Sequence, residues 1–225
     1  MEGIYLMINV IYEDNHLLVV EKPINVPVQA DNSNDLDLLT MLKNFIKNRD
    51  NKPGNVYLGL VHRLDRPVGG IMVFAKTSKC ASRLSEQVRN RTFKKTYYAI
   101  VENKIDKYGK FVDKLLKDNK RNIVHINDRG KLAILDYELV EYKENLSLVK
   151  INLETGRSHQ IRVQLSSHGF PLHGDQKYNK NSKVGEQIAL FSNCITFRHP
   201  ITKEILTFKL NLPDKYPWNL FKSVK

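Results

Sequence analysis

The stretch LAILDYELVEYKENLSLVKINLET, residues 132–155, decides the fold class, because it contains two strand-like runs joined by a short link. Residues 132–140 and 146–155 are rich in aliphatic side chains, and only EYKEN separates them. Parallel strands need a crossover of a dozen residues or more, whereas antiparallel strands can be joined by a short loop. The sequence therefore predicts a long antiparallel hairpin.

Further strands and helices are predicted on both sides of this hairpin. Strand patterns occupy 16–23, 56–65, 70–76 and 96–102, and two more surround a turn at His199-Pro200. Helical spacing predicts helices after Asp35 or Asp37, after Ser78, and after Ser158 with Gly169 as its stop. Strands outnumber helices, and sequence neighbours can pair. We expect an α+β fold with a mixed, largely antiparallel β-sheet and flanking helices.

The chain shows no internal repeat or long linker, so a single domain over residues 1–225 is expected. No window approaches the roughly 20 apolar residues of a membrane span, and the first residues lack the pattern of a signal peptide. Cys80 and Cys194 both lie in apolar patterns and are expected to be buried thiols. Together these features predict a cytoplasmic protein.

The charge of the chain points to a polyanionic partner. The formal net charge is +12, and residues 76–131 contain 16 Lys and Arg against 6 Asp and Glu. A basic excess concentrated in one segment suits a surface that follows nucleic-acid phosphates. A solvated lysine-rich face without a partner is the alternative explanation.

The segment VHRLDRPVGG, residues 61–70, holds one carboxylate, Asp65, between Arg63 and Arg66. A guanidinium beside a carboxylate lowers its pKa, which keeps it ionised and ready to act as a nucleophile or base. Gly69 and Gly70 would let another backbone approach closely, that of a nucleic acid among others. A surface Arg-Asp-Arg turn without chemistry is the alternative.

Two further segments carry candidate residues. In LETGRSHQIR, residues 153–162, Arg157 precedes a predicted helix start, where an anion is favoured, and could pair with Asp65 or with a phosphate. In FKKTYYAIVE, residues 93–102, Tyr97 and Tyr98 point to opposite faces of a strand, so one of them could stack on a base. Solvated arginines and ordinary packing are the alternatives.

Several chemistries find no support in the sequence. It contains no P-loop, G-x-S-x-G, H-E-x-x-H or C-x-x-C motif. The histidines at 159, 168 and 173 are not joined by a cysteine or acid at ligand spacing, so no metal site is expected.

Taken together, four segments resemble the successive signature motifs of the RluA-type RNA pseudouridine synthases. They are HRLDRPVGGIMVFAKT, KKTYYAIVE, LETGRSHQIRVQLSSHGFPLHGDQKY and FRHPITKE, and the likeness spans residues 10–212 in the family's order. The resemblance implies the catalytic fold of that family and isomerisation of uridine to pseudouridine in structured RNA, tRNA or rRNA. It implies no cofactor and no metal.

The resemblance also implies a role for each matched residue. Asp65 would be the catalytic aspartate, Tyr97 would stack on the uracil, and Arg157 would pair with Asp65. Arg63 would fill the space left by the flipped-out uridine. Contacts with RNA are implied for Arg66, Lys95, His159 and Arg162.

The chain departs from the family pattern in two places. No N-terminal S4-type domain fits the sequence, so targeting would rest on the catalytic domain and a basic insert at residues 103–131. Phe191 stands where the family is expected to carry histidine. We expect a monomer that binds RNA and no membrane. A non-catalytic RNA-binding protein and a base-excising glycosidase are the alternative functions.

Overall fold

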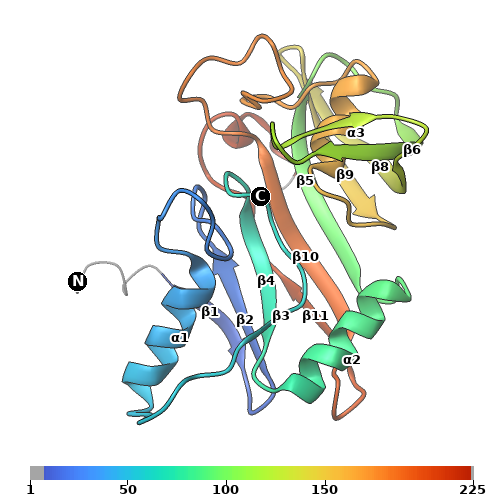
Figure 1. Ribbon diagram of the computed structural model, residues 1–225. Helices are drawn as coiled ribbons and strands as arrows, with labels where there is room; N and C mark the ends of the chain where they lie inside the picture. The colour runs from blue at the N-terminus through green and yellow to red at the C-terminus, as the bar shows by residue number, and fades with distance from the viewer. Residues whose placement is uncertain (1–7, 224–225) are drawn as a thin grey trace. The chain divides into compact units, whose positions relative to one another are not determined.

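The computed structural model describes residues 8–223, which form two compact units (Figure 1). The first unit contains the described residues up to Phe93 together with Cys194–Leu210. The second contains Lys94–Asn193 together with the described residues from Asn211 onward. The α+β fold with a largely antiparallel sheet is confirmed, whereas the single domain over residues 1–225 remains a prediction.

In the first unit, β2 (Leu17–Lys22) lies between β1 (Asn9–Glu13) and β4 (Gly69–Ala75) and is antiparallel to both. The short strand β3 (Gly59–Leu60) also pairs with β4, which reduces the strand predicted at 56–65 to two residues. The strand β10 (Leu190–Arg198) forms a hairpin with β11 (Ile205–Lys209), as predicted for the turn at His199-Pro200.

The core of the first unit is built on alternate residues of β2 and β4. On one face, side chains of these two strands form a cluster with residues of the helix α2 (Ser78–Arg89), of β10 and with Phe93. The buried members of this cluster are Leu17, Val19, Ile71, Val73, Cys80, Leu84, Phe93, Ile195 and Phe197. The Phe93 and Phe197 rings stack with centroids 5.2 Å apart. The alternate residues on the other face, such as Leu18 and Phe74, are also fully buried. Residues 17–20 of β2 and all of β4 are therefore apolar, which is why these segments are continuous hydrophobic runs in the sequence.

Helix caps agree with the sequence in part. The helix α1 (Leu38–Arg49) begins after Asp37, whose side chain accepts a hydrogen bond from the Thr40 N–H. The cap of α2 is Thr77, one residue before the predicted Ser78, and it accepts from the Cys80 N–H. The prediction of Ser158 as the cap of the third helix is wrong: α3 (Gln160–Ser167) follows His159, which has a left-handed backbone.

The second unit is an antiparallel sheet in the order β5-β9-β8-β6-β7, with α3 in contact with β6 and β7. The hairpin predicted at 132–155 is confirmed as β8 (Lys131–Lys143) and β9 (Leu146–Leu153), with a bulge between Leu139 and Glu141. The strand β5 (Lys94–Glu102) pairs with β9 on the other side.

The basic insert is itself part of this sheet, which the sequence analysis did not predict. It forms β6 (Tyr108–Asp118) and β7 (Ile123–Ile126). Phe111, Leu115 and Val124 are buried, whereas Lys110 and Lys114 alternate with them and are exposed. The period of two was present in the sequence, but lysine occupied so many outward positions that the segment looked like a charged loop.

The C-terminal segment closes the second unit through aromatic contact. Trp218, in the short 3-10 helix Trp218–Leu220, meets Phe191 edge to face with centroids 6.4 Å apart. Phe191 is only 5% exposed. The residue that departs from the family pattern is therefore a core residue, and packing explains why it is aromatic and apolar.

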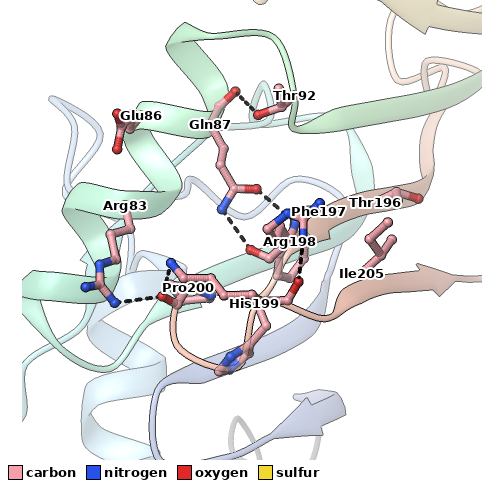
Figure 2. Close-up of a pocket in the computed structure, with 11 residues that line it drawn as sticks. Arg83, Glu86, Gln87, Thr92, Thr196, Phe197, Arg198, His199, Pro200 and Ile205 are labelled. Carbon is pink, nitrogen blue, oxygen red and sulfur yellow. Dashed lines mark hydrogen bonds between the residues drawn. The ribbon is translucent and has the colours of Figure 1, made fainter.

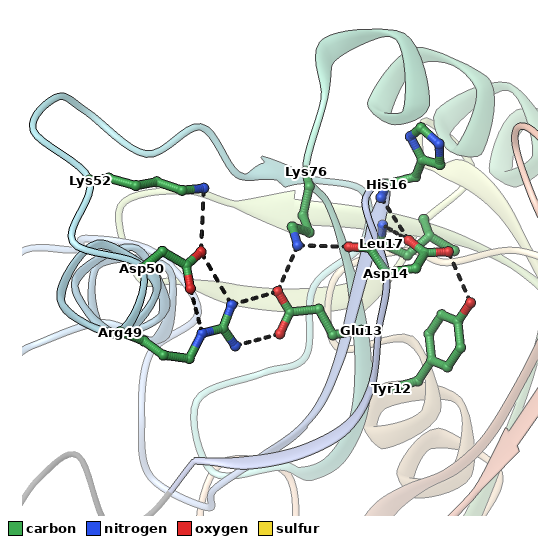
Figure 3. Close-up of polar contacts among 9 residues, drawn as sticks. All are labelled: Tyr12, Glu13, Asp14, His16, Leu17, Arg49, Asp50, Lys52 and Lys76. Carbon is green, nitrogen blue, oxygen red and sulfur yellow. Dashed lines mark hydrogen bonds and ion pairs between the residues drawn. The ribbon is translucent and has the colours of Figure 1, made fainter.

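Charged groups join the end of β1 to α1 and β4 in the first unit (Figure 3). Both oxygens of Glu13 accept from the Arg49 guanidinium, at 2.6 and 2.9 Å, and Lys76 Nζ donates to Glu13 Oε1 at 2.6 Å. Arg49 also pairs with Asp50. The hydrogen bonds from Arg49, followed by those from Lys76, lower the pKa of Glu13 to about 2, against the opposing effect of its partial burial.

We expect Glu13→Gln to remove part of the acid sensitivity of the fold. The lowered pKa stabilises the folded state above pH 4.5, and this contribution is lost as the pH falls towards 2. The free energy of unfolding, measured with denaturant, should therefore fall more between pH 4.5 and pH 2 for the wild type than for the variant. Glu144→Gln, at an exposed turn of the other unit, is the control. Parallel curves for wild type and Glu13→Gln would contradict the prediction.

Candidate active site

Residues 62–65, directly before the turn at Pro67, present Arg63 and Asp65 on one side of the chain. His62 and Leu64 are 8% and 7% exposed, whereas Arg63 is exposed and Asp65 is partly exposed. The buried side chains are anchored in the first unit, since His62 Nε2 accepts from the Val73 N–H and its ring contacts Phe93. Alternation therefore turns the carboxylate and the neighbouring guanidinium away from the core.

The turn after Asp65 is held by hydrogen bonds to a buried ammonium group. Lys22, at the end of β2, is 1% exposed, and its Nζ donates to the carbonyl oxygens of Pro23, Arg66 and Val68 at 2.8, 3.0 and 2.8 Å. Three acceptors match the three N–H groups of an ammonium. Burial lowers the pKa of Lys22 to about 7, and the charge of Asp65 acts in the opposite direction.

The side chain of Arg66 also connects this turn to the loop at residues 25–35. The Val68 N–H donates to the Asp65 carbonyl at 2.9 Å, which closes the turn. The Arg66 guanidinium donates to the Asn25 carbonyl and to Ser33 Oγ, and it pairs with Asp35. These contacts give Arg66 a role in fixing the loop, while its predicted RNA contact remains a prediction.

The close approach permitted by the two glycines involves the chain itself. A Cβ at Gly69 would lie 3.0 Å from Ile24 Cγ2 and 3.3 Å from the Lys22 carbonyl oxygen. Gly70 has a φ of 121°, which L side chains rarely adopt, and it pairs with Lys22 in the sheet. The expectation of a nucleic-acid backbone at this place is therefore replaced by the backbone of residues 22–24.

In the second unit, Lys95 and Tyr97 share one face of β5. Tyr97 is 5% exposed and lies opposite Ile151, whereas Tyr98 is on the other face and is more exposed. A Cβ at Gly156 would lie 2.9 Å from Lys95 Nζ, so this ammonium lies against the turn that carries Arg157. Burial lowers the pKa of Lys95. Three sequence-predicted residues, Lys95, Tyr97 and Arg157, thus come from adjoining parts of one unit.

A buried amide holds the turn of Arg157 against β8. Gln160 is 3% exposed; its Oε1 accepts from the Arg157 N–H at 3.0 Å and from Thr155 Oγ1 at 2.8 Å. Its Nε2 donates to the Ile134 carbonyl at 3.1 Å. The exposed Arg157 guanidinium donates from Nε to the Leu132 carbonyl at 2.9 Å. Together these bonds fix the turn that carries Arg157 against β8.

His159 and Arg162 are held by partners within the second unit. Arg162 is 6% exposed and forms a two-point ion pair with Asp175, at 2.9 and 2.7 Å, and its guanidinium lies over the Tyr178 ring. His159 Nδ1 is 2.6 Å from the Tyr178 hydroxyl. The buried ion pair accounts for Arg162 structurally, and the RNA contacts implied for both residues remain predictions.

Lys22 and Gln160 are two buried polar residues that position the candidate site and that were not predicted from the sequence. A lysine that ends an apolar strand directly before Pro23 was a usable signal, since buried lysines need acceptors. Gln160 gave no comparable signal, because its carbonyl partners become visible only when the turn folds onto β8.

A family model described as RNA pseudouridylate synthase matches residues 16–167, a range that includes Asp65, Tyr97 and Arg157. The chain belongs to this family, of RluA type. It is an RNA pseudouridine synthase, an isomerase that acts on uridine in RNA. The resemblance read from the four motifs is confirmed.

Two relatives illustrate the similarity. Ribosomal large subunit pseudouridine synthase D of Buchnera aphidicola is 33% identical over 228 residues, covering 94% of this chain and 70% of the relative. The synthase D of Pseudomonas aeruginosa is 31% identical over 229 residues, covering 95% and 71%. This pseudouridine synthase therefore spans about 70% of the length of these relatives.

The fold is similar to that of a human protein of known structure. Human RNA pseudouridylate synthase domain containing 4 superimposes with a TM-score of 0.76 at 22% identity, covering 91% of this chain and 88% of the other. Within residues 8–223, no helix is long and apolar enough to cross a membrane. The same residues contain no cluster of three side chains suited to a metal ion.

We expect Lys22→Met to destabilise the first unit in a pH-dependent way. The variant leaves three carbonyl oxygens without their donor, at a cost of about 1–3 kcal/mol. The pKa of Lys22 is about 7 when folded and near 10.5 when unfolded, so the unfolded chain binds more protons between these values. The stability difference between wild type and variant should therefore grow as the pH rises from 7 to 10.

The measurement is the free energy of unfolding in urea at pH 6, 7, 8 and 9. Lys47→Met, at an exposed position of α1, serves as the control and should show no such trend. A difference between wild type and Lys22→Met that stays constant above pH 7 would contradict the lowered pKa.

Gln160→Leu should disturb the position of Arg157 without changing a predicted catalytic group. It keeps the approximate volume but removes the partners of the Arg157 N–H, Thr155 Oγ1 and the Ile134 carbonyl. We expect a loss of about 2–4 kcal/mol in unfolding free energy and a lower kcat. Gln176→Leu, which removes one exposed bond, should cost less than about 0.5 kcal/mol by thermal unfolding. Equal effects of the two variants would show that the buried amide is not needed.

Proposed function

We propose that this pseudouridine synthase isomerises uridine in large-subunit ribosomal RNA, with Asp65 as its catalytic carboxylate. The observation that carries the assignment of Asp65 is the anchored turn, in which Lys22 and Arg66 fix the backbone that directly follows a partly exposed acid. Relatives named as ribosomal large subunit pseudouridine synthases support rRNA as the substrate in preference to tRNA.

The reaction rearranges bonds within a single nucleotide. The C1′–N1 bond breaks, the uracil turns, a C1′–C5 bond forms, and the proton from C5 is lost while N1 gains one. A carboxylate can serve by attacking C1′ or by removing the 2′ proton to give a glycal. Nothing is hydrolysed, so one carboxylate suffices, whereas glycosidases generally require a pair.

The target uridine has to leave the RNA stack before this chemistry can occur. Extrusion of a base costs a few kcal/mol, which the enzyme recovers through stacking and hydrogen bonds. We assign stacking on the uracil to Tyr97 and occupation of the vacated space to Arg63, whose exposed side chain shares a side with Asp65. Arg157 is proposed to pair with Asp65, as the motif resemblance implies.

The basic insert supports RNA as the binding partner. Residues 103–131 contain nine Lys and Arg against four Asp. In β6 the side chains of Lys114 and Lys117 are exposed on opposite faces of the strand, whereas Lys110 pairs with Asp136 and Glu154. Exposed lysines favour phosphate contacts whose strength falls as the salt concentration rises.

We expect Asp65→Asn to abolish isomerisation and to leave most RNA binding intact. The amide is nearly isosteric but cannot act as a nucleophile or base, so tritium release from C5-labelled uridine should fall by at least about 10³-fold. Asp128→Asn, an exposed position in the insert, makes the same charge change and should retain activity. Full activity of Asp65→Asn would refute the assignment of the carboxylate.

The substrate is tested by mapping pseudouridine with carbodiimide and primer extension in a strain that lacks the gene. A site in large-subunit rRNA should disappear and return with the wild type but not with Asp65→Asn. Loss of a site in tRNA alone would overturn the assignment of large-subunit rRNA as the substrate. Release of free uracil would indicate excision in place of isomerisation, and retained RNA binding with no lost site would favour a non-catalytic binding protein.

A further inference from the structure

A cationic pocket lies in the first unit between α2 and the β10–β11 hairpin (Figure 2). Its volume is about 420 Å³, which is in the range of small-ligand sites. Asp65 is not among the residues that line it. The pocket is therefore a feature that the proposed chemistry does not use.

Three cationic side chains converge on this pocket from different elements. Arg83 of α2 donates from Nη1 to the Pro200 carbonyl at 2.7 Å, and Lys203 Nζ donates to the same oxygen at 3.1 Å. Arg198 donates from Nη1 to the Lys203 carbonyl at 2.8 Å. Each guanidinium has five N–H groups, so one bond to a carbonyl orients it and leaves donors for a ligand. Glu86 is the one acid among the lining residues.

The turn at the base of the pocket is pre-organised by a buried histidine. His199 is 2% exposed; its Nδ1 accepts from the N–H groups of Ile201 and Thr202, and its Nε2 lies 3.0 Å from Asp14 Oδ2. Gln87 of α2 bonds the backbone of Arg198 in both directions, at 2.7 and 2.9 Å. The cationic groups are thus mounted on a fixed frame, which reduces the entropy lost on binding.

Apolar side chains complete the pocket beside its cations. Phe197 and Pro200 are buried in its wall, and Ile205 is 68% exposed at its edge. Arginine donors beside apolar surface suit a nucleotide, whose phosphate takes the charge and whose base and ribose take the apolar contact.

We propose that this pocket binds one nucleotide of the RNA substrate away from the reacting uridine and so contributes to RNA affinity. The proposal depends on RNA being the substrate, but not on which RNA is modified or on Asp65 being catalytic. Its consequence is that the first unit carries an RNA contact of its own, in addition to the basic insert of the second unit.

The sharpest test changes the charge at the exposed edge of the pocket in both directions. Ile205→Glu should weaken and Ile205→Lys should strengthen binding of a large-subunit rRNA transcript in a filter assay, each by about 3–10-fold at low salt. Both variants should fold, because the side chain is 68% exposed, and thermal unfolding checks this. Val184→Glu and Val184→Lys, at a site 97% exposed, make the same charge changes and should alter affinity less than twofold.

A second variant pair removes the cations themselves. Arg83→Gln combined with Arg198→Gln should raise the Kd about 10-fold or more, lower the salt slope by about two, and act on KM in preference to kcat. The control is Lys43→Gln combined with Lys47→Gln on α1, which removes the same charge.

The outcomes separate this pocket from the isomerisation itself. Equal RNA affinities of Ile205→Glu and Ile205→Lys, or a Kd of the double arginine variant equal to that of its control, would overturn the proposal. Saturable binding of UMP at this pocket, together with the same RNA affinity in the wild type and in the pocket variants, would also overturn the proposal, in favour of a mononucleotide site. If the wild type formed no pseudouridine while the Ile205 variants shifted RNA binding in opposite directions, the pocket would stand and the proposed reaction would fail.

Discussion

The buried ammonium of Lys22 is the interaction on which the candidate site of the first unit depends. It joins the end of β2 to the turn that follows Asp65 through three carbonyl oxygens. A charge removed from water is costly unless every donor is satisfied, and here the number of acceptors equals the number of N–H groups. The arrangement fixes the turn backbone while leaving the Asp65 side chain partly exposed, so that rigidity and access occur together.

Basic side chains recur in this protein as donors to backbone carbonyls. Lys22 does this below the Asp65 turn, Arg157 on β8, and Arg83 at the base of the cationic pocket. A carbonyl oxygen orients a cation without neutralising it, unlike a carboxylate. In the buried pair of Arg162 and Asp175, by contrast, the carboxylate compensates the charge of the guanidinium. Lys22 is buried and serves the fold alone, whereas Arg157 and Arg83 reach the surface and keep their charge for an anionic partner such as RNA.

The motifs predicted the candidate site residues, but only part of what positions these residues. The strands at 16–23, 70–76 and 132–155 were predictable because their apolar runs and short links leave few alternatives. The segment 103–131 was not recognised as two strands, because exposed lysines masked the alternation of Phe111 and Leu115. Ser158 failed as a cap because a left-handed His159 and the Gln160 side chain organise that turn.

The sequence by itself determined the family, the fold class and the candidates Asp65, Tyr97 and Arg157, since these depend on residue types at fixed spacings. Tertiary structure alone decided that Lys22 supports the Asp65 turn, that Gln160 supports Arg157, and that a cationic pocket lies beside α2. The physical reason is that hydrogen bonds between residues such as Lys22 and Val68, 46 positions apart, leave no periodic trace in the chain. They exist only once the strands bring distant donors and carbonyls together.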